Sequence, residues 1–395
     1  MIYTIPSIRD LKLKGQSVFI RVDFNVPLKD GVITDDSRIT EALPTIKYAI
    51  LEGAKVVLGS HLGRPDGERK SEFSMEPVAL HLASLLNQDV TLAQDCVGEG
   101  IEMMVKSLKN GSVLLLENLR FYKEEEANDP EFSKKLSRLC SIYVNDAFGT
   151  AHRKHASTYG MATLAPIRAM GFLIEKELKF VGPLVSMPAK PFGAILGGSK
   201  VSDKIKTIEA LMSQVQLLCI GGAMAHAFDV AMGKTIAPKA KPPKTEEVEA
   251  ARRVLSLSKS KEIPVYLPVD TNEGFDIGRA TVQLFAEKLS VCKTIFWNGP
   301  LGWFENPPYN FGTFKLAELI ADYKAIKVVG GGDTVSALKL SGFASKFDHL
   351  STGGGAVLEF IEKGSLPGID ILQTEEKRQT DESQHLSRER VVVKP

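Results

Sequence analysis

The chain has little cysteine, no long apolar run and almost no net charge. Its four cysteines, Cys96, Cys140, Cys219 and Cys292, lie far apart and form no Cys-x-x-Cys pair. Neither a disulfide framework nor a zinc site is therefore indicated, and a reducing compartment is favoured. No apolar stretch is long enough to span a bilayer, and the N-terminus MIYTIPSIRDLKLKG lacks the basic and apolar segments of a signal peptide. We expect a cytoplasmic protein without a membrane partner.

Charge and size exclude further classes. The formal net charge is +1, from 49 basic and 48 acidic residues, so bulk charge gives no attraction to nucleic acid. A composition of 44% hydrophobic and 25% charged residues is typical of a soluble globular protein. A chain of 395 residues exceeds the usual size of one hydrophobic core, which favours two domains.

Short apolar, β-branched runs alternate with segments of helical periodicity along the chain. This pattern predicts an α/β fold with two doubly wound parallel sheets, one in each half. Near-continuous hydrophobicity in the runs suits strands that are covered on both faces. The expected strands span residues 17–23, 55–60, 113–117 and 142–146 in the first half, and 193–196, 217–220, 265–267, 294–297 and 327–329 in the second.

The domain boundaries follow from the segments between these runs. GFLIEKELKFVGPLV, residues 171–185, has apolar residues at helical spacing and predicts a helix that joins a first domain, 1–170, to a second, 186–372. Residues 233–244 are rich in proline and lysine and predict a surface loop within the second domain. Residues 373–395 form a charged tail without aromatics, which is not expected to join a core.

Cationic residues follow the expected strands of the first half. In open α/β sheets, ligands bind at the carboxyl ends of the strands. One isolated arginine there usually makes a surface salt bridge, and the pair His152 and His155 lacks a third metal ligand. Several arginines at corresponding strand ends instead predict a small, multiply anionic ligand, because guanidinium groups suit carboxylate and phosphate. The set comprises Arg21, Asp23, Asn25, His61, Arg64, Arg120 and Arg153, with Arg38 just before a helix whose first turn accepts Pro44.

Glycine-rich turns follow the expected strands of the second half. Any one of them can be a simple strand-to-helix turn, but five in one half favour a nucleotide, because glycine lets backbone N–H groups approach phosphate oxygens. These turns are Gly197-Gly198, Gly221-Gly222, Asn298-Gly299, Gly330–Thr334 and Gly353–Gly355. Asp333 beside Thr334 suits magnesium, which prefers one or two carboxylates plus phosphate oxygens and water.

The stretch FGAILGGSKVSDKI, residues 192–205, resembles a phosphate loop in an unusual order. Lys200 and Lys204 lie four apart where an amphipathic helix is expected to begin. Cations in a first helical turn oppose the helix dipole, at a cost of roughly 0.3–1 kcal/mol each at an exposed site. A bound anion removes this conflict. The alternative is a solvated helix end of mixed charge, since Asp203 partly offsets the lysines.

With these residues in hand, the chain is identified as a member of the phosphoglycerate kinase family. The motifs that carry the resemblance are RVDFNVP, SHLGRP, ENLRF, YVNDAFGTAHR, LGGSKVSDKI, WNGPLGWFE, GGGDT and STGGGA, in the family's order over about residues 17–356. The resemblance implies a reversible, magnesium-dependent transfer of a phosphoryl group between 1,3-bisphosphoglycerate with ADP and 3-phosphoglycerate with ATP. It also implies two Rossmann-like domains facing each other across a cleft.

The resemblance assigns roles to particular residues. Those implied for phosphoglycerate are Arg21, Asp23, Phe24, Asn25, Arg38, His61, Leu62, Gly63, Arg64, Arg120 and Arg153. Those implied for the nucleotide are Lys204, Gly274, Asn298, Glu305, Gly331, Gly332, Asp333 and Thr334, with Asp333 as the magnesium ligand. Arg38, Lys200 and Gly353, Gly354 and Gly355 are expected to flank the transferred group.

The resemblance further implies a monomer whose cleft closes about the joining helix, and whose chain end returns to the N-terminal domain. Two features depart from the family pattern. Arg279 stands where the family commonly has proline, so the family's adenine contacts need not carry over near Gly274. The tail beyond Leu372 is longer than the resemblance accounts for.

Two other functions remain to be weighed. A nicotinamide-dependent dehydrogenase also has doubly wound domains, but the chain lacks a Gly-x-Gly-x-x-Gly fingerprint after its first strand. A catalytically retired relative that only binds metabolites or acts as a scaffold would be expected to have lost reactive groups. Arg38, Lys200, Lys204 and Asp333 are all present.

Overall fold

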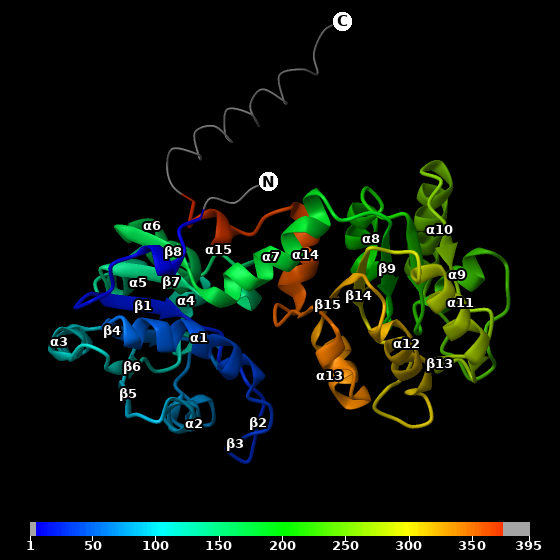
Figure 1. The fold of residues 1–395 in the computed structure, drawn as a ribbon. Helices are drawn as coiled ribbons and strands as arrows, with labels where there is room; N and C mark the ends of the chain where they lie inside the picture. Colours follow the sequence, from blue (N-terminus) through cyan, green and yellow to red (C-terminus); the bar gives the residue numbers. More distant parts are fainter. Residues whose placement is uncertain (1–4, 374–395) are drawn as a thin grey trace, which may run out of the picture. The chain divides into compact units, whose positions relative to one another are not determined.

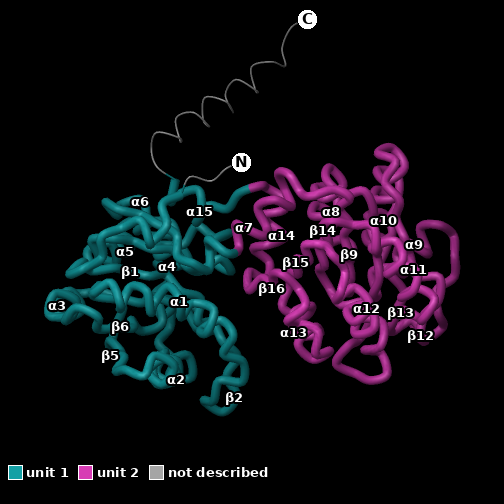
Figure 2. Tube along the Cα trace, viewed as in Figure 1, with its two compact units in different colours: residues 1–176, 365–395 teal, residues 177–364 magenta. Residues whose placement is uncertain are grey.

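The computed structural model describes residues 5–373 and divides them into two compact units. Unit 1 holds residues 5–176 together with 365–373, and unit 2 holds residues 177–364 (Figure 2). Of the charged tail predicted at residues 373–395, residues 374–395 lie outside the described residues. No helix within the described part of the chain is long and apolar enough to cross a membrane.

Unit 1 is built on a six-stranded parallel sheet with the order β5-β6-β4-β1-β7-β8. Helices lie on both sides of this sheet (Figure 1). The strands are β1 (Ser17–Arg21), β4 (Lys55–Gly59), β5 (Val90–Leu92), β6 (Val113–Leu115), β7 (Ile142–Asn145) and β8 (Ile167–Met170). The helices are α1 (Ser37–Leu51), α2 (Glu76–Leu86), α3 (Glu99–Ser107), α4 (Lys123–Glu126), α5 (Pro130–Ser137), α6 (Met161–Leu164) and α15 (Pro367–Asp370).

The apolar runs form the sheet because both of its faces are buried. Val18 and Ile20 of β1 point to one face and pack in a core with Ile46 of α1. Phe19 points to the other face and stacks on Tyr143 at 6.1 Å between ring centroids. Each such side chain contributes roughly 1.5–3 kcal/mol on burial. The sequence missed the edge strands β5 and β8, which are short and partly exposed and so lack the continuous apolar pattern.

The sequence-based start of the first helix was wrong. Helix α1 begins at Ser37, so Arg38 lies within its first turn, and Pro44 lies inside the helix. Proline has no N–H to donate to the carbonyl of Thr40, which removes one helical hydrogen bond. Burial of Ile39, Ala42 and Ile46 along one side keeps the helix continuous in spite of this loss.

The described end of the chain, residues 365–373, belongs to unit 1. Asn145 at the end of β7 donates its side-chain amide to the carbonyl of Gly368 at 2.8 Å, and Gly368 donates to the carbonyl of Ala151 at 2.8 Å. The expected second domain, 186–372, therefore extends past the structural division at residue 364. The division at the other end falls inside α7 (Phe172–Ser186), the helix that continues from unit 1 into unit 2.

Unit 2 contains a second six-stranded parallel sheet, with the order β11-β10-β9-β14-β15-β16. Numbered along the chain this is the order 3-2-1-4-5-6 of the Rossmann fold. The strands are β9 (Phe192–Leu196), β10 (Leu217–Ile220), β11 (Val265–Tyr266), β14 (Thr294–Asn298), β15 (Ile326–Gly330) and β16 (His349–Leu350). The helices are α8 (Ile205–Leu211), α9 (Ala225–Ala231), α10 (Thr245–Ser260), α11 (Arg279–Leu289), α12 (Phe311–Ala321), α13 (Gly332–Ser341) and α14 (Gly355–Lys363).

Two short antiparallel hairpins complete the fold: β2 (Leu28–Lys29) with β3 (Val32–Ile33), and β12 (Thr271–Asn272) with β13 (Asp276–Ile277). Residues 233–244 contain no helix or strand, as the sequence predicted. The sequence did not find β16, which has only two residues. The helix expected to begin at Lys200 begins instead at Ile205, after a short 3-10 turn, Ser202–Lys204.

Unit 2 has one buried and one exposed helical leucine, and comparing them measures what burial contributes to stability. Leu316 of α12 is fully buried, whereas Leu340 of α13 is 68% exposed. We expect Leu316→Ala to lower the free energy of unfolding of unit 2 by about 2–5 kcal/mol, through lost burial and a cavity. Leu340→Ala should change it by no more than about 0.5 kcal/mol. Urea unfolding followed by tryptophan fluorescence reports unit 2 alone, because both tryptophans lie in it; equal shifts would contradict the assigned core.

Candidate active site

Each sheet reverses its direction of winding beside its first strand. The reversal lies between β1 and β7 in unit 1, and between β9 and β14 in unit 2. Ligands of open α/β sheets bind outside the carboxyl ends of the strands at such a point. The strand ends are level there, since Arg21 pairs with Asn145 and Leu196 pairs with Asn298. Each unit thus has a candidate site at its reversal point.

Positive charge in unit 1 gathers around His61, which follows β4 and is only 5% exposed. Burial holds the pKa of this imidazole well below its ordinary value, because desolvation penalises the charged ring. Nearby guanidinium groups lower the pKa further, and they belong to Arg21, Arg120, Arg38 and Arg153. His61 is therefore neutral at physiological pH, in the middle of four permanent positive charges.

The proton of this neutral ring can be placed from its partner. Nη2 of Arg21 lies 3.4 Å from Nδ1 of His61. A guanidinium has only donors, so Nδ1 must accept and Nε2 must carry the proton. Oδ1 of Asp23 is 4.0 Å from Nδ1, too far for a hydrogen bond. His61 thus offers an N–H donor at Nε2, which suits an anion.

Arg38 is held at the site by one of its nitrogens. Nη1 donates to both carboxylate oxygens of Asp23 at 3.2 Å and to the carbonyl of Asn25 at 3.1 Å. Its other guanidinium nitrogens make no hydrogen bond within the described residues. The side chain is 35% exposed, so this end of the fork is accessible to a ligand.

Four predicted residues have contacts that support the site. Asn25 accepts a hydrogen bond from the backbone N–H of Gly63 at 2.8 Å, which fixes the loop that carries Arg64. A Cβ on Gly63 would lie 2.3 Å from the ring of Phe73, so only glycine fits there. The side chains of Phe24 and Leu62 are 0% and 2% exposed and pack in the core, which leaves only their backbone for a ligand.

The remaining arginines differ in their exposure and in how many of their nitrogens already have a partner. Arg120 is buried and donates to the carbonyl of Gly63 at 2.9 Å, and it pairs with Glu126 at 3.3 Å. Nε of Arg153 donates to Nε2 of His152 at 3.1 Å, which leaves its two terminal nitrogens unpaired among the described residues. Arg64 is exposed and is not among the arginines that act on His61.

Lys204 lies at the reversal point of unit 2. Its ammonium donates to the carbonyl of Gly197 at 2.6 Å and to the carbonyl of Asn298 at 3.1 Å, bridging the ends of β9 and β14. Burial lowers its pKa to about 8, although Asp333 and Asp203 act in the opposite direction. A bound anion would restore the charged form, because an opposite charge favours it.

Two helices that begin at the same edge of the sheet as Lys204 have no side-chain cap. Helix α13 starts after Gly331 and α14 starts after Gly354, and neither has a cap hydrogen bond from a side chain. Their free backbone N–H groups and the positive end of the helix dipole favour phosphate. Gly331 has φ +93°, and a Cβ there would approach Nδ2 of Asn298 at 2.8 Å, so the turn needs glycine. Thr334 is buried and accepts from the N–H of Gly299 at 2.7 Å, which joins the turn to β14.

Asp333 in the first turn of α13 is exposed, and its carboxylate makes no hydrogen bond within the described residues. A single accessible carboxylate beside free N–H groups fits magnesium that also binds phosphate oxygens and water. No group of three or more metal-ligating side chains lies together in the described part of the chain.

The sequence missed the group that holds the turn Gly353–Gly355. Glu177 of α7 is fully buried and binds the chain just before this turn. Its carboxylate accepts from Nε2 of His349 at 2.8 Å, from the hydroxyl of Ser351 at 2.9 Å and from the N–H of Thr352 at 3.0 Å. The available signal was a carboxylate on the apolar stripe of the predicted helix 171–185.

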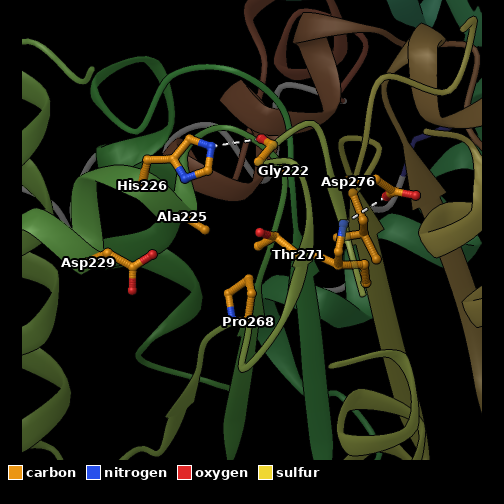
Figure 3. A pocket seen from close by; sticks show the side chains of 10 residues that line it. Gly222, Ala225, His226, Asp229, Pro268, Thr271 and Asp276 are labelled. Atoms are coloured by element: carbon orange, nitrogen blue, oxygen red, sulfur yellow. Dashed lines mark hydrogen bonds between the residues drawn. The ribbon is translucent and has the colours of Figure 1, made fainter. Parts of the chain in front are cut away.

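Gly274, predicted on the adenine side, lines a small pocket (Figure 3). Its carbonyl accepts from Nε2 of His226 at 2.9 Å, and a Cβ on Gly274 would lie 2.8 Å from that of Ala240. The pocket holds about 10 Å³, room for about one water. A wider groove of about 630 Å³, within the usual range of small-molecule sites, shares His226 and Asp229 with it. Of these two cavities, the wider groove is the one with room for more than a water molecule.

Lys200 and Glu305 are both exposed and make no hydrogen bond or ion pair with another described residue. The structure thus brings Lys204, Asn298 and the turn Gly331–Thr334 together at one point of unit 2. Asn298 donates a hydrogen bond from its side-chain amide to the carbonyl of Gly330 at 2.8 Å. Lys200 and Glu305 have no protein partner that would fix their role.

Comparisons with known proteins agree with this geometry. A family model described as phosphoglycerate kinase matches residues 8–273 and 270–364. The chain is 47% identical over 399 residues to the phosphoglycerate kinase of Anaeromyxobacter sp. (strain Fw109-5), covering 93% of this chain and 99% of that protein. It is 48% identical to the phosphoglycerate kinase of Dictyoglomus turgidum, covering 94% and 98%.

Solved structures show the same fold. The phosphoglycerate kinase of Coxiella burnetii superposes with a TM-score of 0.84 at 38% identity, and that of Pyrococcus horikoshii OT3 with 0.82 at 34%. Each covers 93% of this chain and 98% of the solved chain. Fold and site together define a phosphotransferase built from two Rossmann-like domains. More particularly, the chain belongs to the phosphoglycerate kinase family.

The same cationic cluster makes the stability of unit 1 depend on pH. Burial and the nearby Arg21, Arg120 and Arg153 lower the pKa of His155 to about 3. The unfolded chain protonates this ring below about 6.5, so it binds more protons than the folded chain at pH 5. Acidification from pH 7.5 to 5 should therefore lower the free energy of unfolding of the wild type. We expect this loss to be smaller by about 1 kcal/mol in His155→Asn, because the variant lacks the ring that takes up a proton on unfolding. Urea unfolding by circular dichroism measures this; an equal loss in both proteins would contradict it.

Proposed function

We propose that the chain catalyses the reversible transfer of a phosphoryl group between 1,3-bisphosphoglycerate with ADP and 3-phosphoglycerate with ATP. The observation that carries this proposal is the contrast between the two reversal points. One presents arginines around a neutral histidine, which suits a small, multiply charged anion. The other presents a lysine between strand ends and two uncapped helices, which suits nucleotide phosphates.

In unit 1, the charged groups bind the phosphoglycerate. Nε2–H of His61 and the unpaired nitrogens of Arg38 and Arg153 donate to its oxygens, and Arg120 supports them from a buried position. Asp23 both orients Arg38 and accepts from a substrate hydroxyl, since its carboxylate is 10% exposed. Arg64, which is exposed, contributes attraction at longer range.

In unit 2, Lys204 and the turn Gly331–Thr334 bind the phosphates of the nucleotide. The groove bordered by His226 and Asp229 accepts the base, and Glu305 binds the ribose. Asp333 would hold Mg²⁺, and the ion would neutralise negative charge on the phosphate oxygens. The roles of Lys204 and the turn Gly331–Thr334 rest on their position at the strand ends, whereas the role of Glu305 rests on the family resemblance.

The transfer needs positioning and charge neutralisation, and no covalent intermediate on the protein. The acyl oxygen–phosphorus bond breaks as the terminal oxygen of ADP bonds to phosphorus. Arg38 and Lys200 neutralise the equatorial oxygens, helped by the N–H groups of Gly353–Gly355. Closure of the domains about α7, a monomeric state and a cytoplasmic location are predictions from the sequence that remain open to test.

A coupled assay tests the activity, and Arg38→Ala tests the transfer role. We expect the wild type to consume ATP when 3-phosphoglycerate and magnesium are present. Arg38→Ala should lower turnover by about 10³-fold or more, by analogy with arginine fingers. A folded wild-type protein without activity would favour the alternative of a retired, metabolite-binding relative. Near-normal turnover of Arg38→Ala would remove Arg38 from catalysis.

The two lysines of the stretch 192–205 should separate by mutation. Because the folded pKa of Lys204 is about 8, binding of ADP at pH 8.5 should take up a proton as the ammonium form is restored. Lys204→Ala should lose this uptake and bind ADP more weakly, whereas Lys200→Ala should keep both and lower turnover. Calorimetry in buffers of different ionisation enthalpy measures the uptake. Unchanged uptake in Lys204→Ala would refute the assignment.

A further inference from the structure

A buried carboxylate outside the predicted site is linked to it. Glu125 of the short helix α4 is 0% exposed, and both of its oxygens bind Ser157. Oε1 accepts from the hydroxyl at 2.5 Å, and Oε2 accepts from the backbone N–H at 3.0 Å. Burial raises the pKa of this carboxyl, while Arg21 acts in the opposite direction and favours the charged form. The cost of burying Glu125 indicates that its contacts have a use beyond packing.

Ser157 links Glu125 to Arg21 by a second hydrogen bond. Its hydroxyl oxygen accepts from Nε of Arg21 at 2.7 Å, so the hydroxyl proton is directed to Glu125. The serine lies in a π-helical turn, Ala156–Gly160, and its carbonyl accepts from the hydroxyl of Tyr143 at 2.9 Å. Backbone, carbonyl and hydroxyl are therefore all fixed, and the serine has one orientation.

Arg21 in turn is fully engaged. It is 1% exposed, with Nε on Ser157, Nη1 on the carbonyl of Val22, and Nη2 facing Nδ1 of His61. No carboxylate among the described residues hydrogen-bonds to this guanidinium. Glu125 is joined to this guanidinium through one serine. The orientation of Arg21 determines which group faces Nδ1 of His61.

We propose that Glu125 is a positioning residue of the phosphoglycerate site, which acts through Ser157 and Arg21 to keep the proton of His61 on Nε2. This inference rests on the proposed function only for the identity of the ligand. Without the chain of hydrogen bonds Arg21 is free to turn, and the neutral ring of His61 loses the donor that makes Nδ1 an acceptor. The ring then also populates the form with the proton on Nδ1, which presents a lone pair to the anion.

Positioning and simple electrostatics predict opposite results for Glu125→Gln. Removing a negative charge near a cationic site strengthens anion binding if charge alone matters. Loss of positioning weakens it. We expect the KM for 3-phosphoglycerate to rise about tenfold, the usual scale for one hydrogen bond to a charged group. The KM for ATP should stay within about twofold, because the nucleotide site belongs to unit 2.

Glu124→Gln is the matched control. Glu124 precedes Glu125 on α4, is exposed, and makes no side-chain contact with the site, so the control removes the same charge from the surface. Water and salt screen that charge, and both KM values should remain within about twofold of the wild type. A fall in the KM for 3-phosphoglycerate in Glu125→Gln, or no change beyond that of the control, would overturn the proposal.

A second measurement does not depend on activity. In protein labelled with ¹⁵N-histidine, the resonances of His61 are assigned by their loss in His61→Gln. We expect the wild type to show the Nε2–H form, unchanged from pH 8 to 6, and Ser157→Ala to show a mixture of both neutral forms. An unaltered Nε2–H form in Ser157→Ala would overturn the relay even if the chain proved inactive.

Ser157→Ala also decides the question if Glu125→Gln does not fold, because it removes only the bridging hydroxyl. Its KM for 3-phosphoglycerate should rise in the same direction as that of Glu125→Gln. Should the wild type fail to use 3-phosphoglycerate, the proposed function fails while the resonance test of the relay still stands. The two ideas are therefore separable.

Discussion

Positive charge that is only partly paired, at the carboxyl ends of two parallel sheets, is the constraint on which the rest of the structure depends. Parallel strands end level with one another, so the residues that follow them meet at one edge. In unit 1 that edge holds guanidinium groups that depress the pKa of His61, and in unit 2 it holds Lys204 and two uncapped helix starts. Both edges have the charge and the N–H donors that suit an anion, which is the basis of the proposed function.

The two units meet this constraint by different chemistry. Unit 1 uses side chains, and each needs a support: Asp23 for Arg38, Asn25 for the loop at Gly63, and Ser157 with Glu125 for Arg21. Unit 2 uses backbone N–H groups, which need only glycine turns and a few clamps such as Asn298 on Gly330. A buried polar side chain costs free energy unless its hydrogen bonds are all made, so each of these supporting residues lies within hydrogen-bonding distance of its partner.

The repetitive part of the molecule was predictable from the sequence. The central strands were found because burial on both faces requires continuous apolar runs, as in SVFIR and FGAIL. The edge strands β5, β8 and β16 were not, since a short or half-exposed strand has no such pattern. Helix starts were misplaced at Ser37 and Ile205 because tertiary burial overrode the proline and the lysines that suggested other boundaries.

The sequence by itself determined the fold class, the family and the types of residue at the strand ends, because periodicity and residue chemistry act locally. The tertiary structure decided what those residues bind. It placed Phe24 and Leu62 in the core, left Lys200 and Glu305 without a partner among residues 5–373, and assigned the last described residues to unit 1. It also joined Glu125 to Arg21 and Glu177 to Ser351. Such contacts link segments far apart in the chain, and no local pattern encodes which distant partner a buried charge will meet.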